Sequence, residues 1–239
     1  MKIVKDLIRA LLKRLPQSTV ISVRSGPLKG YRWLMHSGVH TYWRGAYEPE
    51  LARALQQVVK PGMTCFDCGA NAGYFTLLLS KLTGPTGKVF SFEPVPVNAN
   101  YIRRHLALNA IQNVTLLEYA LADTNGTVNF FGGGAQGQIS ANGNLSVACR
   151  AIDSAGLPPP DVMKIDVEGA EVALVRGAQR TLQTYRPGIF MALHIPESEA
   201  KDLGCQLTSM GYDVTLWGSS CELVAVASVQ RLTQSSNTK

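Results

Sequence analysis

The sequence lacks the features that mark secreted, membrane-spanning or disulfide-stabilised proteins. Its 239 residues contain no apolar run near the roughly 20 residues that a bilayer span requires. Charges interrupt the N-terminal apolar residues throughout, so we expect no secretory signal. The five cysteines are odd in number, which argues against a disulfide framework in a chain of this size. We therefore expect a cytoplasmic protein.

Acidic residues are nearly absent from the first 32 positions, which hold eight basic side chains and one acid, Asp6. The rest of the chain has 15 basic and 16 acidic residues, so the net charge of +6 belongs to the N-terminal segment. A domain without a basic excess does not offer the broad positive surface that nucleic-acid binding requires. We expect no nucleic-acid partner.

The basic N-terminal segment has a helical pattern. Residues 2–15 place apolar side chains at helical spacing with Lys and Arg on the other face, and Pro16 ends the run. Two interpretations stay open. The helix can pack on the domain or on a partner, or residues 1–16 can lie on an anionic membrane surface. The second would place the protein peripherally at the inner membrane face.

The chain beyond this segment alternates between strand and helix patterns. Such alternation predicts an α/β domain with a parallel sheet and helices on both faces. The last two strands are too close for a crossover helix and should form an antiparallel C-terminal hairpin. We divide the chain into an N-terminal helix with an aromatic extension (1–47), the domain (48–230) and a disordered tail (231–239). The predicted strands are 64–67, 88–93, 114–119, 161–166, 189–194, 212–217 and 223–228, and the predicted helices are 48–59, 74–82, 97–108, 172–185 and 197–210.

Two further segments have less regular patterns. Residues 26–47 indicate a short hairpin or extended entry with several aromatic side chains, which could cover a substrate or pack on the first helix of the domain. Residues 132–149 are rich in Gly, Ser, Asn and Gln, and we interpret them as a loop or irregular hairpin beside the site.

A loop that reads Asp-Cys-Gly-Ala-Asn-Ala-Gly, residues 67–73, follows the first strand of the domain. Its glycines let the backbone approach a ligand and offer N–H groups. A dinucleotide-binding loop reads G-x-G-x-x-G and is suited to a pyrophosphate. Here an acid leads the loop, which suits a ligand with an ammonium and a sulfonium. We expect Asp67, Gly69, Asn71 and Gly73 to bind this cofactor.

Polar residues also follow the second and third strands. Glu93 stands where an acid accepts hydrogen bonds from the hydroxyls of an adenosine ribose, although it could instead cap the helix after Pro94. Ala120 and Asp123 follow the third strand. Asp123 could reach the adenine amino group or cap the turn at 123–126.

Asp166 and His194 end the fourth and fifth parallel strands. In an open parallel sheet, the carboxyl ends of the strands carry the ligand site. A carboxylate and an imidazole there could bind a divalent metal or remove a proton from a hydroxyl. We take His194 as the base and Asp166 as a catalytic and cofactor-binding residue, while Glu168 and Glu171 could instead fix the loop and the helix start.

The motifs together resemble the FkbM-type family of class I S-adenosylmethionine-dependent methyltransferases. The resemblance covers roughly residues 40–215, and its most specific part is the run Lys-Ile-Asp-Val-Glu-Gly from position 164. The matching stretches are Tyr42-Trp43, Tyr47-Glu48-Pro49-Glu50, Phe66 to Tyr74, Phe92-Glu93-Pro94, Asn109 with Asn113-Val114, Ala120 to Asp123, and Met163 to Glu171 ahead of Gly177-Ala178.

This resemblance implies a Rossmann-like fold with a seven-stranded, mostly parallel sheet of order 3-2-1-4-5-7-6. It also implies S-adenosylmethionine as methyl donor and O-methylation of a sugar, glycolipid or natural product. The family often has an acid two residues before the histidine of the fifth strand, where this chain has Ala192 before His194. That departure weakens the case for a divalent metal.

Two other functions compete with methyl transfer. An NAD-linked oxidoreductase is disfavoured by the acid that leads the first loop and by the missing G-x-G-x-x-G. A non-catalytic cofactor-binding module is disfavoured by Asp166 and His194, which it would not need. The acceptor, a small molecule or a glycan, and the oligomeric state are not specified by any motif.

Overall fold

The computed structural model describes residues 15–131, 138, 139, 143, 145–217 and 222–227. The predicted N-terminal helix, apart from its last residue, and the predicted tail lie outside this part. Among the described residues, no helix is both long and apolar enough to cross a bilayer.

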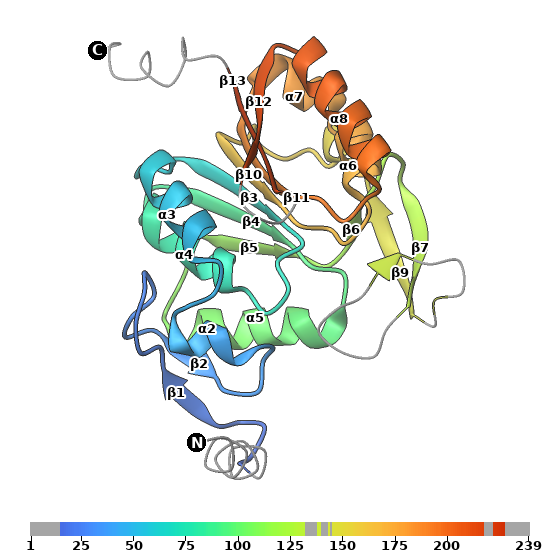
Figure 1. The fold of residues 1–239 in the computed structure, drawn as a ribbon. Coiled ribbons are helices and arrows are strands. Elements are labelled where there is room, and N and C mark those ends of the chain that lie inside the picture. The colour runs from blue at the N-terminus through green and yellow to red at the C-terminus, as the bar shows by residue number, and fades with distance from the viewer. Residues whose placement is uncertain (1–14, 132–137, 140–142, 144, 218–221, 228–239) are drawn as a thin grey trace.

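A seven-stranded sheet forms the centre of the protein, in the order β12-β13-β11-β10-β3-β4-β5 (Figure 1). Five strands pair in parallel and two close the edge antiparallel. The predicted α/β class with a parallel central sheet is confirmed. The parallel strands are β3 (Thr64–Cys68), β4 (Lys88–Phe92), β5 (Val114–Leu117), β10 (Val162–Ile165) and β11 (Gly188–Ala192), and the edge strands are β12 (Tyr212–Trp217) and β13 (Glu222–Ala227).

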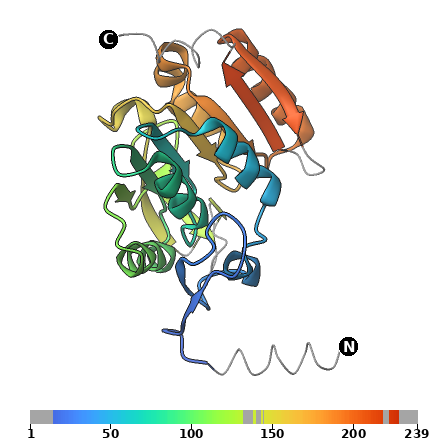
Figure 2. The ribbon, with the colours of Figure 1, turned by 90° about the vertical axis from the view of Figure 1, so that its left-hand side faces the viewer.

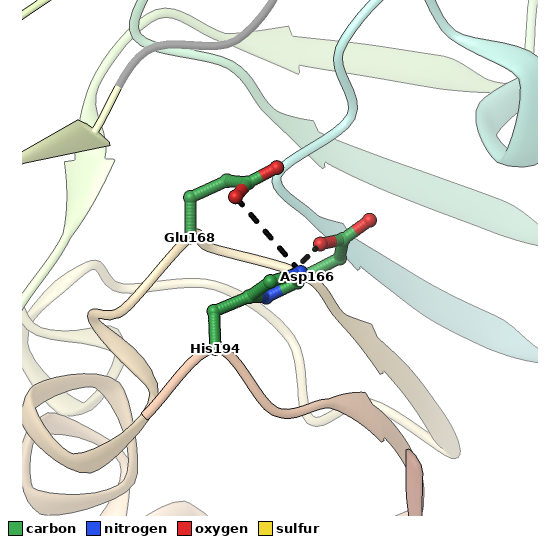
Figure 3. A group of neighbouring side chains, drawn as sticks. All are labelled: Asp166, Glu168 and His194. Carbon is green, nitrogen blue, oxygen red and sulfur yellow. Dashed lines mark ion pairs between the residues drawn. The ribbon is translucent and has the colours of Figure 1, made fainter. Parts of the chain in front are cut away.

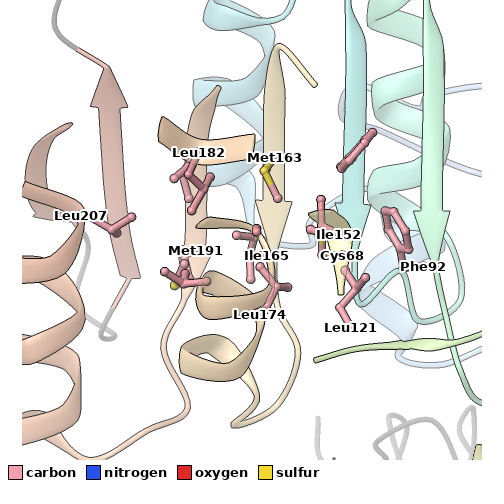
Figure 4. Packing of buried hydrophobic residues seen from close by; sticks show 14 of the residues in the cluster. Cys68, Phe92, Leu121, Ile152, Met163, Ile165, Leu174, Leu182, Met191 and Leu207 are labelled. Atoms are coloured by element: carbon pink, nitrogen blue, oxygen red, sulfur yellow. The ribbon is translucent and has the colours of Figure 1, made fainter. Parts of the chain in front are cut away.

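Side chains alternate along each buried strand and point to both faces of the sheet. Helices cover both faces and bury these side chains. Cys65 of β3 packs into one apolar cluster with α3 (Pro49–Val58) and α4 (Tyr74–Thr83). The next residue, Phe66, packs into the other cluster. In that cluster, Met163 and Ile165 of β10 and Met191 of β11 lie against the helices that follow (Figure 4). The remaining long helices are α5 (Pro96–Leu108) and α8 (Glu197–Ser209).

The single helix predicted for residues 172–185 is wrong, because the chain forms α6 (Glu171–Gly177) and α7 (Gln179–Tyr185) instead. A Cβ on Gly177 would lie 2.0 Å from the carbonyl oxygen of Ala122, so the chain packs tightly there. The carboxylate of Asp153 then accepts the N–H groups of Arg180 and Thr181, at 2.7 and 2.8 Å. An acid distant in the sequence thus accepts the backbone N–H groups that have no partner within the first turn of α7.

For residues 132–149 the irregular hairpin, and not the loop, agrees with the described residues, which pair antiparallel with β7. The chain forms a second, four-stranded sheet of order β6-β9-β7-β8. In β9 only Val147 and Cys149 are buried, so the strand alternates between a covered and an exposed face. Because the exposed face carries polar residues, the amino-acid composition of this segment does not indicate a strand. Its members are β6 (Ala120–Leu121), β7 (Gly126–Phe131), β8 (Gln138–Ile139) and β9 (Leu145–Arg150), followed by the short 3-10 helix η1 (Ile152–Ser154).

Residues 20–47, called the N-terminal segment from here on, contain a hairpin of β1 (Val20–Ser22) and β2 (Arg32–Leu34) and a short helix α2 (His40–Arg44). The hairpin was predicted within residues 26–47, so its first strand lies before the predicted range, and α2 was not predicted. In Figure 2 this blue segment lies beside the green helix α5. Trp33 stacks on the ring of His105 at 3.8 Å between centroids. The Nε2 atom of His105 accepts the N–H of Leu34 at 3.0 Å, and Nδ1 bonds the carbonyl of Ala72 at 2.8 Å. His105 therefore joins this segment to the loop of residues 67–73, which we call the cofactor loop.

The stability of this joint should depend on pH through His105. Burial lowers the pKa of His105 to about 4, below its ordinary value of 6.5. The unfolded chain therefore takes up a proton first as the pH falls, and the contribution of His105 is full above pH 6.5 and declines below it. We expect a loss of about 1 kcal/mol between pH 7.5 and 5.5 from this group. Urea unfolding of the wild type and His105→Gln at both pH values would measure it, and equal losses in both proteins would refute the assignment.

Candidate active site

A cavity of about 670 Å³ opens beside the carboxyl ends of β3, β4 and β10. The cofactor loop, the end of β4 and the loop after β10 form one part of its wall, and the N-terminal segment forms another. Tyr42 and Tyr47 of that segment line the cavity and also pack in the cluster that contains α3, so the packing interpretation is confirmed, and the covering of a substrate stays a prediction. The polar and aromatic lining residues include His36, Tyr42, Tyr47, Asn71, Tyr74, Phe75, Glu93, Asn98, Tyr119, Lys164, Asp166 and Glu168.

Gly69 allows the cofactor loop to pass close to the loop after β10. Its φ is +81°, and a Cβ there would lie 1.8 Å from the carbonyl oxygen of Asp166. The N–H groups of Gly69 and Ala70 both donate to the carbonyl of Phe92 at 3.0 Å. Gly73, with a φ of +91°, begins α4 against the side chain of Ile102. The glycines therefore fix the loop backbone that lines the cavity.

Glu93 faces the cavity and is only 4% exposed. One carboxylate oxygen accepts the N–H of Asn71 at 2.7 Å, and the other accepts the N–H of Val95 at 2.9 Å and the amide of Asn98 at 3.3 Å. Burial raises the pKa of Glu93 to about 7, although these donors oppose the rise. The predicted role at the helix start is therefore confirmed, whereas the ribose contact stays a prediction for a side chain that also lines the cavity. Asn98 was not predicted as a residue of the site. Its position five residues after Glu93, an acid at the end of a strand, is a sequence signal that could have indicated it.

Asp67 is fully buried and lies outside the cavity lining, a position that does not favour the direct cofactor contact predicted for it. Its Oδ2 accepts the hydroxyl of Thr76 at 2.6 Å. The parallel register places Lys164 beside it, with Nζ 3.7 Å from Asp67 Oδ1 and 3.2 Å from both Asp166 Oδ2 and the carbonyl of Gly69. Lys164 therefore links the buried acid to the loop and to Asp166.

Ala120 is buried and lines the cavity, where the cofactor contact that we expect of it stays a prediction. Asp123 is exposed and lies outside the lining, where its Oδ1 accepts the hydroxyl of Thr124 at 3.3 Å. This position agrees with the turn-capping interpretation of Asp123 and not with an adenine contact.

Asp166 and His194 come together at the edge of the cavity, as the strand ends predicted (Figure 3). Nδ1 of His194 lies 3.7 Å from Asp166 Oδ1 and 3.4 Å from Glu171 Oε1, and Nε2 lies 3.9 Å from Glu168 Oε2. The interaction with Glu171, followed by the charges of Glu168 and Asp166, raises the pKa of His194 to about 9 against the opposing effect of burial. Glu168 and Glu171 therefore belong to the site.

The architecture and the placement of these groups define a class I S-adenosylmethionine-dependent methyltransferase. The fold matches methyltransferase FkbM from Methylobacillus flagellatus, with a TM-score of 0.56, 18% identity, and coverage of 94% of this chain and 60% of that one. A family model described as the methyltransferase FkbM domain matches residues 67–214. The chain belongs to this family, and the resemblance inferred from the motifs is confirmed.

Two curated relatives show what related proteins act on. The hexuronic acid methyltransferase AglP of Haloferax volcanii is 25% identical over 145 residues, which cover 57% of this chain and 59% of AglP. The 2-O-methyltransferase NoeI of Sinorhizobium fredii is 27% identical over 153 residues, which cover 53% of this chain and 62% of NoeI. The matches thus span about three fifths of each relative.

Proposed function

We propose that this protein transfers the methyl group of S-adenosylmethionine to a hydroxyl of a sugar, glycolipid or natural product. The observation that carries the proposal is one cavity that joins Glu93, suited to a ribose, to Asp166 at the reacting end. The names of AglP and NoeI, a hexuronic acid methyltransferase and a 2-O-methyltransferase, support a sugar hydroxyl. The cofactor loop would lie against the methionine part through the backbone of Gly69 and Asn71, which line the cavity, because the N–H groups of Gly69, Asn71 and Gly73 already donate to other residues of the protein.

The reaction joins the acceptor oxygen to the methyl carbon while the bond from that carbon to sulfur breaks. The electron pair of the broken bond stays on sulfur, which leaves as the thioether of S-adenosylhomocysteine, and the hydroxyl proton is lost. The protein contributes mainly by placing the two reactants in line. Asp166 and His194 are the catalytic residues of this proposal, because they would orient the hydroxyl and assist the loss of its proton at the cavity edge.

Cofactor affinity should depend on the ionisation of Glu93. Its pKa of about 7 means that the carboxylate form, which accepts both ribose hydroxyls, predominates above pH 7 and is lost below it. We expect the Kd for S-adenosylhomocysteine to rise roughly tenfold from pH 8 to pH 6 if only the carboxylate binds. Isothermal calorimetry at both pH values measures this, and Glu93→Gln should bind weakly with little dependence on pH.

Asp123→Asn is the matched control for this experiment, because Asp123 is an exposed acid outside the cavity lining. It should keep the affinity and the pH dependence of the wild type. A Glu93→Gln protein that binds like the wild type at pH 8 would contradict the assignment of the ribose site.

Two measurements test the activity itself. S-adenosylhomocysteine should raise the Tm and NAD should not, whereas the reverse result would favour an oxidoreductase. Incubation with methyl-labelled S-adenosylmethionine and a panel of sugars, glycolipids and hydroxylated natural products should then give a labelled ether. Label on an acceptor nitrogen or carbon would refute the proposed O-methylation.

A further inference from the structure

Three side chains at the cavity edge are arranged as metal ligands. Asp166 and Glu168 come from the loop after β10 and His194 from the loop after β11, and Figure 3 shows them turned toward one another. One ligand atom from each lies within 4.8 Å of the others. Two carboxylate oxygens and an imidazole nitrogen form a ligand set that suits divalent ions such as Mn²⁺.

A buried carboxylate orients the imidazole from behind. Glu171 is fully buried at the start of α6, and its Oε1 accepts the N–H of Gly169 at 3.1 Å and lies 3.4 Å from His194 Nδ1. Its Oε2 is buried and has no hydrogen-bond partner among the described residues. A bound cation would displace one proton of the imidazole, and the proton left on Nδ1 would point at Glu171, with the Nε2 lone pair on the side of Glu168, as in carboxylate–histidine–metal arrangements.

The charges around the cluster are unbalanced. The linked network contains two cations, Lys164 and the protonated His194, against four carboxylates, those of Asp67, Asp166, Glu168 and Glu171. Burying several like charges without partners is costly, and a bound cation offsets this cost. The cluster is therefore short of positive charge at the point where the three ligand atoms converge.

The open side of the cluster faces the place of the reaction. Asp166 and Glu168 both line the cavity, and the backbone of Asp166 contacts the cofactor loop at Gly69. An ion held by three protein ligands keeps further coordination positions for a substrate. Those positions would point into the cavity, where the proposed hydroxyl acceptor must approach the methyl group.

We propose that Asp166, Glu168 and His194 bind a divalent cation of the Mn²⁺ or Mg²⁺ type, which coordinates the acceptor hydroxyl. The cation acidifies the bound hydroxyl, whose proton leaves to water at the cavity edge as the new carbon–oxygen bond forms. His194 then acts as a ligand. The coordination of the acceptor hydroxyl by the cation rests on the proposed function, whereas the binding of the cation to the three side chains does not.

Manganese binding to the full chain tests this directly. Chelator-treated protein is titrated with MnCl₂ in the absence and in the presence of excess S-adenosylhomocysteine, and the free Mn²⁺ is followed by electron paramagnetic resonance. We expect one ion per chain, with an affinity that falls at least tenfold in Asp166→Asn, Glu168→Gln and His194→Ala. Glu199→Gln, which changes an exposed acid on α8, should bind like the wild type. Thermal unfolding of each variant verifies that it is folded.

The outcomes separate the two proposals. A wild type that binds S-adenosylhomocysteine but no Mn²⁺ overturns the cation site and leaves the methyltransferase proposal standing, as does Mn²⁺ binding that the three variants do not change. Stoichiometric Mn²⁺ binding without any affinity for S-adenosylhomocysteine overturns the proposed function alone. Labelled product formed at the full rate in EDTA would also overturn the role of the cation.

Discussion

Gly69→Ala should lower the free energy of unfolding by about 2–4 kcal/mol and abolish measurable binding of S-adenosylhomocysteine. The added Cβ would lie 1.8 Å from the carbonyl oxygen of Asp166 and 2.8 Å from its carbonyl carbon, and backbone cannot yield as a flexible side chain does. The φ of +81° adds strain for any residue with a side chain. The loop must therefore move away from β10 and out of the cofactor site.

Gly156→Ala separates the effect of the close contact with Asp166 from the effect of the positive φ. Gly156 has a φ of +66°, and a Cβ there meets no described atom within 4 Å. This variant should lose only about 1 kcal/mol, from backbone strain alone, and bind the cofactor product normally. Urea unfolding and calorimetry measure both effects. Equal losses in the two variants would show that the contact with Asp166 is not what requires glycine at position 69.

The sequence predicts the catalytic edge of the sheet because local patterns determine it. Strand and helix periods locate the carboxyl ends of the parallel strands, and those ends must lie side by side once the sheet forms. Glu93 and Asp166 therefore line one cavity, and His194, which is not a lining residue, lies beside Asp166, without any knowledge of tertiary contacts.

The parts that escaped prediction depend on contacts between distant residues. The break between α6 and α7 needs Asp153 and Ala122, and the anchoring of the N-terminal segment needs His105. The sequence position of Asp67, at the end of a strand, predicts a cofactor contact. The side chain lies outside the cavity lining because it bonds Thr76 and pairs with Lys164, which the strand register places opposite it. Local patterns contain none of this information.

Lys164→Met should cost about 3–5 kcal/mol of stability, because it leaves two carboxylates without their cation. Lys164 is 3% exposed, and its Nζ lies within 3.7 Å of Asp67 and 3.2 Å of Asp166. Burial lowers its pKa, but Asp166 and Asp67 raise it by more, so it is charged at neutral pH. Lys201→Met, which breaks an exposed pair with Glu197 on α8, should change stability by less than about 0.5 kcal/mol.

Asp67→Asn in the Lys164→Met background should recover much of this loss, since it removes the unpaired charge that is fully buried and leaves only the partly exposed Asp166 without its cation. Burial already raises the pKa of Asp67, and without Lys164 the opposing effect of that cation disappears. A raised pKa in the folded state means that protonation favours folding, so the penalty of Lys164→Met should shrink from pH 8 to pH 5. Urea unfolding of the four proteins of this cycle at both pH values measures the coupling. Additive losses with no pH dependence would mean that Lys164 acts by packing against Phe75 and not by pairing with Asp67.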